Sequence, residues 1–250
     1  MKLLVPLKRV PDPDTRIRVN AAGTAIDPDG VKFAINPFDA IALEESLRLR
    51  DQVGAAEIVV VSIGSPDCQE QLRAGLAMGA DRAILVRHEA ELDSLAIAKI
   101  LAAIYRREQP SFVLMGKQAI DDDNNQAGQM LAALLGIGQA TFVSKIALAD
   151  DRSQATCARE TDAGLETVTV KLPAIITADL RLNEPRYVTA LGIMKAKKKP
   201  LDELTVAELG VDATPRTKQL KLALAPRRSG GIKVKTVDEL VQKLRDAKLV

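Results

Sequence analysis

The residues with the clearest capacity for chemistry lie in one polar run, residues 116–129, which reads GKQAIDDDNNQAGQ. The apolar run before it, residues 111–115, is typical of a buried parallel strand, and residues 130–135 after it indicate a helix. Such strand-to-helix loops lie at the carboxyl ends of strands in open α/β sheets. The N–H groups and positive dipole end of the following helix favour an anion there, and we expect a phosphate.

Other features of the run suit a ligand of this kind. Gly116 and Gly128 let the backbone approach a ligand closely. Four side-chain amides can hydrogen-bond it: Asn124, Asn125, Gln126 and Gln129. The run contains neither a Walker A pattern nor a GxGxxG fingerprint, and an ordinary loop with a capped helix remains an alternative reading of the same spacing.

Three consecutive carboxylates, Asp121, Asp122 and Asp123, stand beside the expected phosphate, with Lys117 as the only local cation. They could cap the helix, accept hydrogen bonds from neighbouring loops or bind a divalent metal through oxygen. Three adjacent acids cannot all converge on one ion. We therefore favour capping over a metal site and predict no bound metal.

Composition narrows the class of protein. At 250 residues and 47% hydrophobic content, the chain can bury a sizeable core. No apolar run approaches the ~20 residues of a membrane span, and the N-terminus turns polar too early for a signal peptide. These features predict a soluble protein of the cytosol or an equivalent compartment, without membrane insertion. Cys68 and Cys157 lack metal spacing and are expected to be buried thiols.

Charge and aromatic content exclude two further classes. The net charge of +2 conceals two basic runs: Lys195 with Lys197, Lys198 and Lys199, and Arg227, Arg228, Lys233 and Lys235. Aromatic residues make up only 2% and Trp is absent, so the stacking platform of single-strand binders is missing and we expect no nucleic-acid partner. His88 is the only histidine and has no nucleophile motif nearby, which argues against a Ser-His or Cys-His hydrolase.

The elements that position the polar run alternate between strand and helix as far as Gly136. Strands are predicted at residues 3–7, 57–63, 82–86 and 111–115, and helices at residues 38–50, 66–77, 94–108 and 130–135. Asn36, Ser65 and Asp93 are the expected N-caps, with Pro37 and Pro66 at the first helical positions. This alternation specifies an α/β fold with a doubly wound, mostly parallel, Rossmann-like sheet of the adenine-nucleotide-binding type.

The remaining segments depart from the alternation. In the long polar stretch at residues 9–32, residues 16–19 and 24–26 are expected to pair as a small hairpin. Strands at residues 142–148, 154–160, 165–171 and 174–178 predict an antiparallel edge on the sheet. Residues 1–200 are expected to form the α/β domain. Residues 201–250 are expected to be an extended C-terminal tail with local order, a short strand at 232–235 and a helix at 236–247, and to pack on a partner subunit.

Several long motifs occur in one chain. They are KRV at 8–10, NPFDAIALEE at 36–45, AMGADRA at 77–83, GKQAIDDDNNQAGQM at 116–130, LPAIITADLRLNEPRY at 172–187 and IMKAKKK at 193–199. Together they resemble the β subunits of electron transfer flavoproteins, and the resemblance covers essentially the whole chain. It implies a heterodimer with an α subunit that holds most of one FAD, while this subunit completes the FAD site and binds a structural AMP.

The resemblance also implies a role without catalysis of its own. Such heterodimers carry electrons from acyl-CoA dehydrogenases of fatty acid β-oxidation, and from other flavin dehydrogenases, to a membrane quinone oxidoreductase. They work in the bacterial cytoplasm or the mitochondrial matrix. The implied cofactor-binding positions are Pro6, Asn36, Pro37, Phe38, Asp39, Ile63, Gly116, Lys117, Gln118, Ala119, Ile120, Asp121, Asp122, Asp123, Asn124, Asn125, Gln126 and Ala127.

A partner-recognition loop is implied at residues 186–195, where a leucine docks into an apolar pocket on the dehydrogenase. The implied partner-binding positions are Tyr187, Ala190, Leu191, Ile193, Met194 and Lys195. The family commonly reads RYATLPNIMK, whereas this chain reads RYVTALGIMK, so Ala190 takes the anchor position and Leu191 comes one place later. A tyrosine common in the family's early loop is also replaced, in the region Asp12 to Asp14, while Phe38 keeps the other aromatic contact with the flavin.

Two other classes fit the same sheet architecture: a stand-alone adenine-nucleotide enzyme that cleaves ATP, and a regulatory nucleotide-binding module without redox partners. Such an enzyme needs a Gly/Ser-rich pyrophosphate loop, whereas the loop at residues 116–129 is acidic and has one lysine. The sequence therefore favours the electron-carrier hypothesis.

Overall fold

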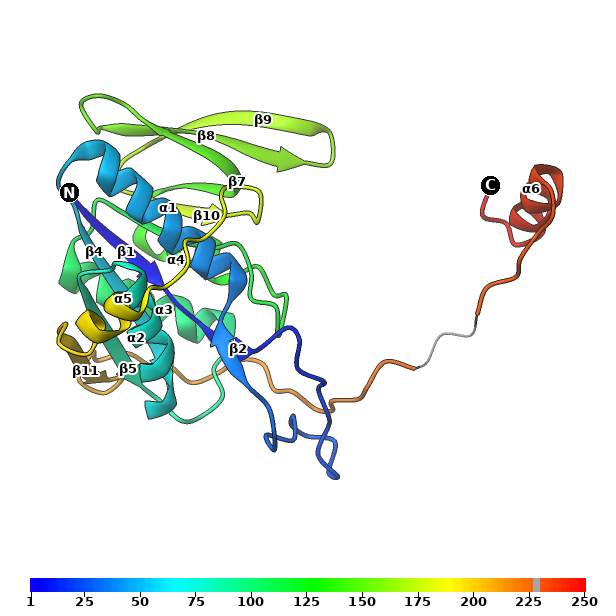
Figure 1. Cartoon of the computed structure of the whole chain (residues 1–250), viewed down its shortest axis with the longest axis horizontal. Coiled ribbons are helices and arrows are strands. Elements are labelled where there is room, and N and C mark those ends of the chain that lie inside the picture. Colours follow the sequence, from blue (N-terminus) through cyan, green and yellow to red (C-terminus); the bar gives the residue numbers. More distant parts are fainter. Residues whose placement is uncertain (227–229) are drawn as a thin grey trace. The chain divides into compact units, whose positions relative to one another are not determined.

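In the part of the chain that the structure describes, one sheet of nine strands forms the centre of the fold (Figure 1). Its strands are β1 (Lys2–Pro6), β4 (Glu57–Gly64), β5 (Arg82–Arg87), β6 (Phe112–Gly116), β7 (Gly138–Leu148), β8 (Gln154–Thr161), β9 (Gly164–Lys171), β10 (Ala174–Ala178) and β11 (Leu201–Thr205). Their order is β11-β5-β4-β1-β6-β10-β7-β8-β9. Neighbours from β11 to β7 are parallel, whereas β8 runs antiparallel to β7 and β9. The predicted doubly wound sheet with an antiparallel edge is confirmed.

The computed structural model describes residues 1–226 and 230–250 and divides into two units. The first comprises residues 1–17 and 28–218, and the second comprises residues 18–27 and 219–250. Residues 201–218 thus lie with the sheet, which differs from the expected division after residue 200. Arg227 and Arg228 of the second predicted basic run lie outside the described residues.

Among the described residues, four helices cover the sheet, two on each face (Figure 1). They are α1 (Pro37–Val53) and α2 (Gln69–Met78) on one face, and α3 (Ser94–Glu108) and α4 (Ala127–Leu135) on the other. In β1, Leu3 and Val5 point to the first helical layer and Leu4 to the second. This period of two explains why the central strands read as continuous apolar runs, since both faces are buried.

The helix starts fall where the sequence predicts them, but the cap residues act differently. Asp93 caps α3 through a hydrogen bond from the N–H of Ala96, at 2.8 Å. Asn36 stands at the N-cap of α1 yet makes no capping hydrogen bond with its side chain. Ser65 likewise makes none, and a short 3-10 helix, η1 (Pro66–Cys68), separates it from α2. Pro37 and Pro66 alone set these two starts.

Three short strands differ from the sequence-based expectation. β2 (Arg9–Pro11) pairs antiparallel with β3 (Phe33–Ile35), while the hairpin expected inside that stretch reduces to one bridge between Val19 and Ile26. β11 pairs with β5 and extends the sheet, where only local order was expected. Residues 232–235 form no strand. β2 and β3 are only three residues long and β11 is a charged edge strand, so none of them shows a strand pattern in the sequence.

The second unit contains α6 (Val237–Asp246), the helix expected near the C-terminus. Thr236 caps it by accepting the N–H of Glu239 at 3.2 Å, and Val237 and Leu240 are exposed on it. Within the same unit, Leu222 N–H donates to the carbonyl of Gly23 at 2.7 Å. None of the described helices is both long enough and apolar enough to span a bilayer.

Candidate functional site

A cavity of about 270 Å³ opens at the carboxyl ends of the central strands. β1 lies between β4 and β6, so the chain progresses outward from β1 in both directions, and ligands bind beside such a reversal point in open α/β sheets. The wall is built from the segments that follow β1, β4, β5 and β6 and from the start of α1. The predicted polar run supplies much of it, with Gly116, Lys117 and residues 124–128 among the lining.

Asp39 joins three of these segments at one buried point. Its carboxylate accepts the N–H of Lys8 at 2.8 Å and the N–H of Gly116 at 3.0 Å, while the side chain is only 5% exposed. The start of α1 is thereby tied to the ends of β1 and β6. Burial raises the pKa of Asp39 to about 7, although the two backbone hydrogen bonds act in the opposite direction.

Asn36 fixes the polar loop from the same helix start. Its Nδ2 donates to the carbonyl of Gln118 at 2.8 Å, and its Oδ1 accepts the N–H of Ile120 at 3.2 Å. Because this amide is occupied with the loop, it cannot also cap α1. The residue predicted as an N-cap therefore acts as a link between α1 and the cavity wall.

The three consecutive carboxylates do not cap α4. Lys8 Nζ donates to Asp121 at 2.8 Å and to Asp122 at 2.9 Å, while Asp123 accepts from Gln118 Nε2 at 2.7 Å. Burial opposes the charged form of Lys8, but these two carboxylates outweigh it and raise the pKa of the lysine. The capping expectation is wrong, since α4 begins after Gln126 without a side-chain cap. The described residues also hold no cluster of metal-binding side chains.

The second cavity lysine is paired as well. Lys117 Nζ lies 2.7 Å from Asp179 Oδ2, 4.9 Å from the ring centre of Phe142 and 5.5 Å from that of Phe38. Phe142 occupies the left-handed region with a φ of 59°, which is strained for a bulky residue. Both lysines of the cavity wall are therefore balanced by carboxylates.

Hydrogen-bond donors remain at the start of α4. The first N–H groups of a helix lack intrahelical acceptors, and Ala127 and Gly128 line the cavity. Gly128 lets α4 sit tightly on the sheet, because a Cβ there would lie 2.7 Å from Thr177 Cγ2. Beside this turn the Oε1 atom of Gln129 is buried without a hydrogen-bond partner among the described residues. The N–H groups at the start of α4 suit an anion, whereas Gln129 Oε1 can only accept a hydrogen bond and is not one of these donors.

Most of the predicted cofactor-binding residues meet at the cavity. The residues that line it are Pro6, Asn36, Asp39, Ile63, Gly116, Lys117, Gln118, Ala119, Asp122, Asn124, Asn125, Gln126 and Ala127. The predicted residues that do not line it are Pro37, Phe38, Ile120, Asp121 and Asp123, of which Asp121 and Asp123 are exposed to solvent. Phe38 is 6% exposed, so little of its side chain is accessible in this subunit.

Sequence reasoning missed a second wall of the cavity. It is formed by His88, Ala90 and Leu92, in the segment between β5 and α3, and by Ser94 and Ile97 at the start of α3. The signal was available, because β5 is parallel to β4 and its carboxyl end must open on the same edge of the sheet. His88 thus lies at the cavity, although it is not part of a nucleophile dyad.

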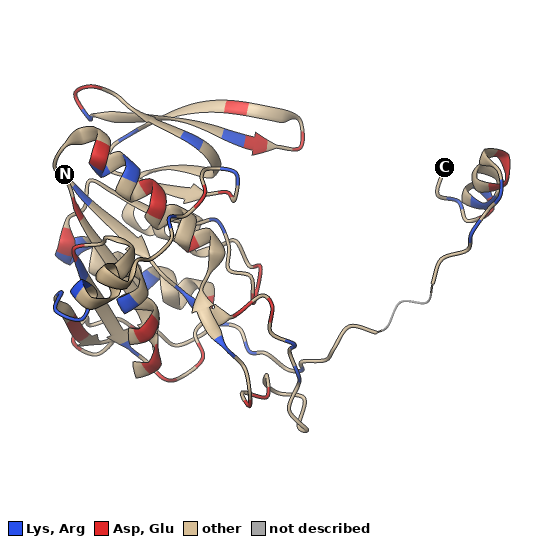
Figure 2. Ribbon diagram, viewed as in Figure 1, with Lys and Arg blue, Asp and Glu red and all other residues tan. Residues whose placement is uncertain are grey.

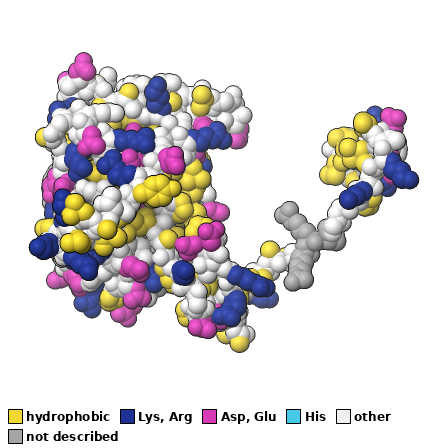
Figure 3. Space-filling model, in the orientation of Figure 1, with side chains coloured by type: hydrophobic (Ala, Val, Ile, Leu, Met, Phe, Trp, Pro, Cys, Tyr) yellow, Lys and Arg dark blue, Asp and Glu magenta, His cyan; other side chains and the backbone are white. Residues whose placement is uncertain are grey.

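The predicted partner loop forms a separate feature on the same unit. Its helix α5 (Ala190–Ala196) lies against the end of α2, where a Cβ on Gly192 would be 2.7 Å from the carbonyl oxygen of Ala77. Apolar side chains project from it, with Leu191 58% and Met194 66% exposed, and Tyr187 before it is 95% exposed. Ala190, Ile193 and Lys195 are also exposed. Figure 3 shows hydrophobic side chains gathered over α5.

Elsewhere on the first unit, acidic and basic side chains are interspersed (Figure 2). Lys197 and Lys198 of the first predicted basic run are exposed, but Lys199 donates to the carbonyls of Leu76 and Ala80. Burial lowers the pKa of Lys199. The basic run is therefore partly structural.

Comparison with known proteins agrees with this geometry. The electron transfer flavoprotein domain model matches residues 24–209. A protein of Bradyrhizobium diazoefficiens named electron transfer flavoprotein subunit beta is 54% identical over 246 residues, covering 98% of each chain. The mitochondrial one of Arabidopsis thaliana is 50% identical with the same coverage, and the one of Homo sapiens is 47% identical, covering 98% of this chain and 97% of its own. The chain therefore belongs to the electron transfer flavoprotein family, as a β subunit.

Proposed function

We propose that this chain binds AMP in the cavity at residues 116–128 and completes the FAD site of an α subunit, so that the heterodimer carries single electrons between flavin enzymes. Family membership already makes it a subunit of an electron-transferring flavoprotein, and its β-subunit relatives imply an α-subunit partner. The observation that carries the finer proposal is the cavity itself, which combines helix-start amides with lysines that are already paired.

The cavity fits a mononucleotide. Its volume of about 270 Å³ lies near the lower end of the roughly 300–1,000 Å³ typical of small-molecule sites. The N–H groups at the start of α4 and the amides of Asn124, Asn125 and Gln126 would hold the phosphate. Leu92, Ile97 and other apolar side chains of the wall would receive the adenine.

Charge balance favours binding over ATP cleavage. An ATP-cleaving site commonly directs a lysine at the phosphates of the nucleotide. Here Lys8 is bound by Asp121 and Asp122, and Lys117 is bound by Asp179. A second or third phosphate would meet Asp122 on the wall rather than a free cation. These pairings support a nucleotide that stays bound and is not turned over.

The flavin belongs mainly to the α subunit in this proposal. The chain offers few aromatic side chains for a flavin, and Phe38 beside Lys117 is only 6% exposed. FAD supplies the redox chemistry when bound, while Phe38 and Lys117 of this chain would border it. The exposed apolar side chains of α6 are proposed to pack on the same α subunit.

The exposed segment at residues 187–195 supports the proposed redox partners. We assign it to docking on acyl-CoA dehydrogenases and other flavin dehydrogenases, with Leu191 as the anchor, and delivery to a membrane quinone oxidoreductase as the next step. Apolar side chains held in water without a partner in their own chain commonly mark protein contacts. The expected compartment is the bacterial cytoplasm, or the mitochondrial matrix in a eukaryote.

Co-expression with the α subunit tests the cofactor assignment. We expect a yellow complex that releases AMP and FAD in about a one-to-one ratio on denaturation, whereas the chain purified alone is colourless. A ligand that binds only the native state at a hundredfold excess over its Kd adds about 2.7 kcal/mol, so removal of AMP lowers the melting temperature. Stoichiometric flavin on the isolated chain, or ATP hydrolysis by the complex, would contradict the proposal.

Truncation of Leu191 tests the docking role. Loss of an interface anchor costs on the order of 2 kcal/mol, or roughly thirtyfold in affinity. Because Leu191 is 58% exposed, Leu191→Ala should leave the melting temperature and the flavin spectrum nearly unchanged while it slows electron acceptance from acyl-CoA dehydrogenases. Ala190→Ser is the matched control and should do much less. Acceptance at the wild-type rate across a panel of dehydrogenases would show that Leu191 is not the anchor.

A further inference from the structure

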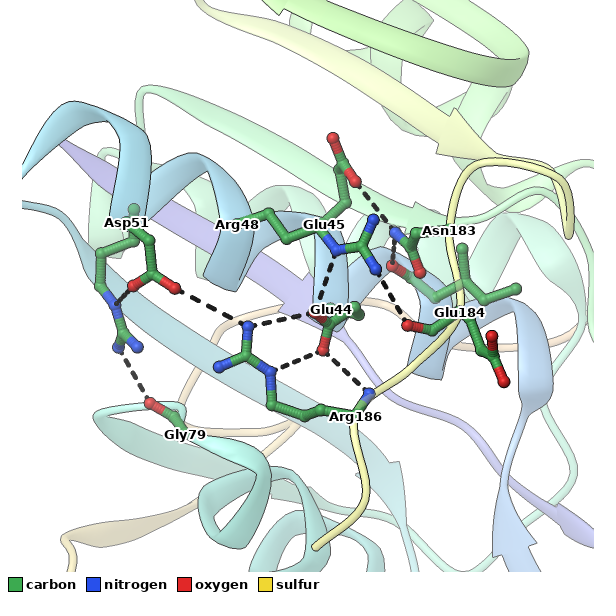
Figure 4. Close-up of polar contacts among 10 residues, drawn as sticks. Glu44, Glu45, Arg48, Asp51, Gly79, Asn183, Glu184 and Arg186 are labelled. Carbon is green, nitrogen blue, oxygen red and sulfur yellow. Dashed lines mark hydrogen bonds and ion pairs between the residues drawn. The ribbon is translucent and has the colours of Figure 1, made fainter.

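The exposed segment at residues 187–195 is bounded by polar contacts at both of its ends. Before it, Glu44 accepts Nε of Arg186 at 2.8 Å, a second guanidinium nitrogen at 3.1 Å and the backbone N–H of Arg186 at 3.1 Å (Figure 4). Three hydrogen bonds from one residue fix both its side chain and its backbone. Arg186, the residue before the segment, is therefore held in a defined position against α1.

A second carboxylate on the same turn of α1 supports this point. Glu45 accepts Nδ2 of Asn183 at 3.0 Å, and the same nitrogen donates to the carbonyl of Ile41 at 3.1 Å. Arg48 donates to Glu44 at 3.1 Å and to the carbonyl of Glu184 at 3.1 Å (Figure 4). We call the contacts of Glu44 and Glu45 with Asn183 and Arg186 the acidic clamp.

The far end of the segment is tied to α2. Arg73 donates to the carbonyls of Ala196 and Lys199, at 2.7 and 2.8 Å, and closes the end of α5. Gly192 rests against the end of α2 midway between the two ties. Residues 187–194 thus leave one fixed point and return to another, with their apolar side chains outward.

The two glutamates are buried, and their hydrogen-bond partners Asn183 and Arg186 come just before the segment. Glu44 is 3% and Glu45 is 7% exposed, although both lie on a surface helix where carboxylates are normally solvated. Burial acts to raise the pKa of Glu44, but the hydrogen bonds from Arg186 and Arg48 outweigh it and lower the pKa. Arg186 itself is 38% exposed, so the pair is half-buried and adds little net stability, and the best-supported role of such a buried carboxylate is to specify one arrangement.

We propose that Glu44, Glu45, Asn183 and Arg186 are positioning residues for partner docking, because they hold residues 187–195 in the conformation that enters an apolar pocket on a flavin dehydrogenase. The proposal rests on the docking role assigned above. A segment already ordered before the encounter loses less conformational entropy on binding, so affinity rises without any new contact. None of the four residues needs to touch the partner.

Hydrogen exchange and steady-state kinetics on the α-subunit complex test the clamp. Glu44→Gln and Arg186→Gln should each speed amide exchange at residues 187–195, by on the order of tenfold if the order of the segment depends on the clamp. With an acyl-CoA dehydrogenase and the complex as varied acceptor, KM should rise about tenfold, equivalent to the loss of ~1.4 kcal/mol, while kcat stays within about twofold. The effect of the double variant should be smaller than the sum of the two single effects, because Glu44 and Arg186 share their side-chain hydrogen bonds.

Glu108→Gln is the matched control. Glu108 is 8% exposed and accepts hydrogen bonds from Arg82 and Lys2, near the amino ends of β1 and β5. This variant should lower the melting temperature yet change neither the exchange at residues 187–195 nor KM. Arg186→Lys keeps the charge but loses the planar fork, and should fall between wild type and Arg186→Gln.

The outcomes separate the clamp from the docking role. Unchanged amide exchange at residues 187–195 in Glu44→Gln overturns the positioning proposal. The proposal is also overturned if the clamp variants show faster exchange but an unchanged KM, while Leu191→Ala raises KM. If Leu191→Ala leaves KM unchanged, the docking role itself fails, whatever the exchange data show. Faster exchange with a raised KM in both clamp variants, absent from Glu108→Gln, supports the proposal.

Discussion

Gly116→Ala is expected to destabilise the protein by about 3 kcal/mol, at the upper end of the range for overpacked cores. A Cβ on residue 116 would lie 2.5 Å from Asp39 Oδ1, 2.6 Å from Phe38 Cβ and 2.9 Å from the carbonyl carbon of Phe38. Two of these atoms belong to the first turn of α1 and cannot rotate away. The helix start would have to move off β6, which would break the hydrogen bond from Gly116 N–H to Asp39.

The measurement is the free energy of unfolding in urea, followed alongside AMP retention. Gly138→Ala is the control, since Gly138 also lies in a strand of the sheet but its new Cβ would lie 3.8 Å from the nearest atom, Val170 Cβ. We expect the control to stay within about 0.5 kcal/mol of wild type. Equal stability of the two variants would show that α1 is not seated on Gly116 as described.

The architecture of the sheet follows from short-range patterns. The central strands are covered on both faces, so residues 57–63 read as one apolar, β-branched run, and Gly54 and Pro110 mark element boundaries around such runs. The carboxyl-end loops then had to share one edge, which is why most of the predicted cavity residues do meet there. Local pattern and fold rules together were sufficient for this part.

The hydrogen bonds and ion pairs that join the segments of the site could not be predicted in the same way. Lys8 lies 113 residues from Asp121 in sequence, and Asn36 lies 82 residues from Gln118. Each side chain also fits a simpler local role. Asn36 could cap α1, and Asp121 could contribute to a cap of α4. The tertiary contact prevailed because the parallel order of β1 and β6 places these loops side by side. No periodicity in the sequence encodes that choice.

Edges of the sheet were missed for a different reason. β11 reads LDELT, with two acids in five residues, and this composition predicts part of a charged tail. Charged residues keep an edge strand from pairing with other chains. The acidic residues that make β11 hard to recognise in the sequence therefore suit its place at the edge of the sheet. The hairpin expected at residues 16–26 was favoured by alternation alone, and only Val19 and Ile26 pair.

The pH dependence of stability should contain a contribution from Asp39. Burial raises its folded-state pKa to about 7 from an ordinary value of 3.8. Between these two values the native state binds the proton more tightly than the unfolded state, so stability falls as pH rises. The contribution is fully present below about pH 4 and is lost as pH passes 7. Between pH 5 and pH 7 the loss is on the order of 2 kcal/mol.

Asp39→Asn should remove that slope, because an amide does not titrate. Its NH₂ group cannot accept a hydrogen bond, so one of the N–H groups of Lys8 and Gly116 loses its acceptor, at about 1–3 kcal/mol. The variant should therefore be clearly less stable than wild type at pH 5. The difference should shrink by on the order of 2 kcal/mol by pH 7, as the wild type loses its own stability.

Urea unfolding of wild type and variants at pH 5, 6, 7 and 8 measures this difference directly. Glu45 also has a pKa raised by burial, but its contribution is the same in both proteins and cancels in the subtraction. Asp162→Asn, in the exposed turn between β8 and β9, removes an aspartate far from this contact and should keep the wild-type slope. If Asp39→Asn runs parallel to wild type from pH 5 to pH 7, Asp39 is ionised throughout that range. The two backbone N–H groups at the cavity would then outweigh the effect of burial.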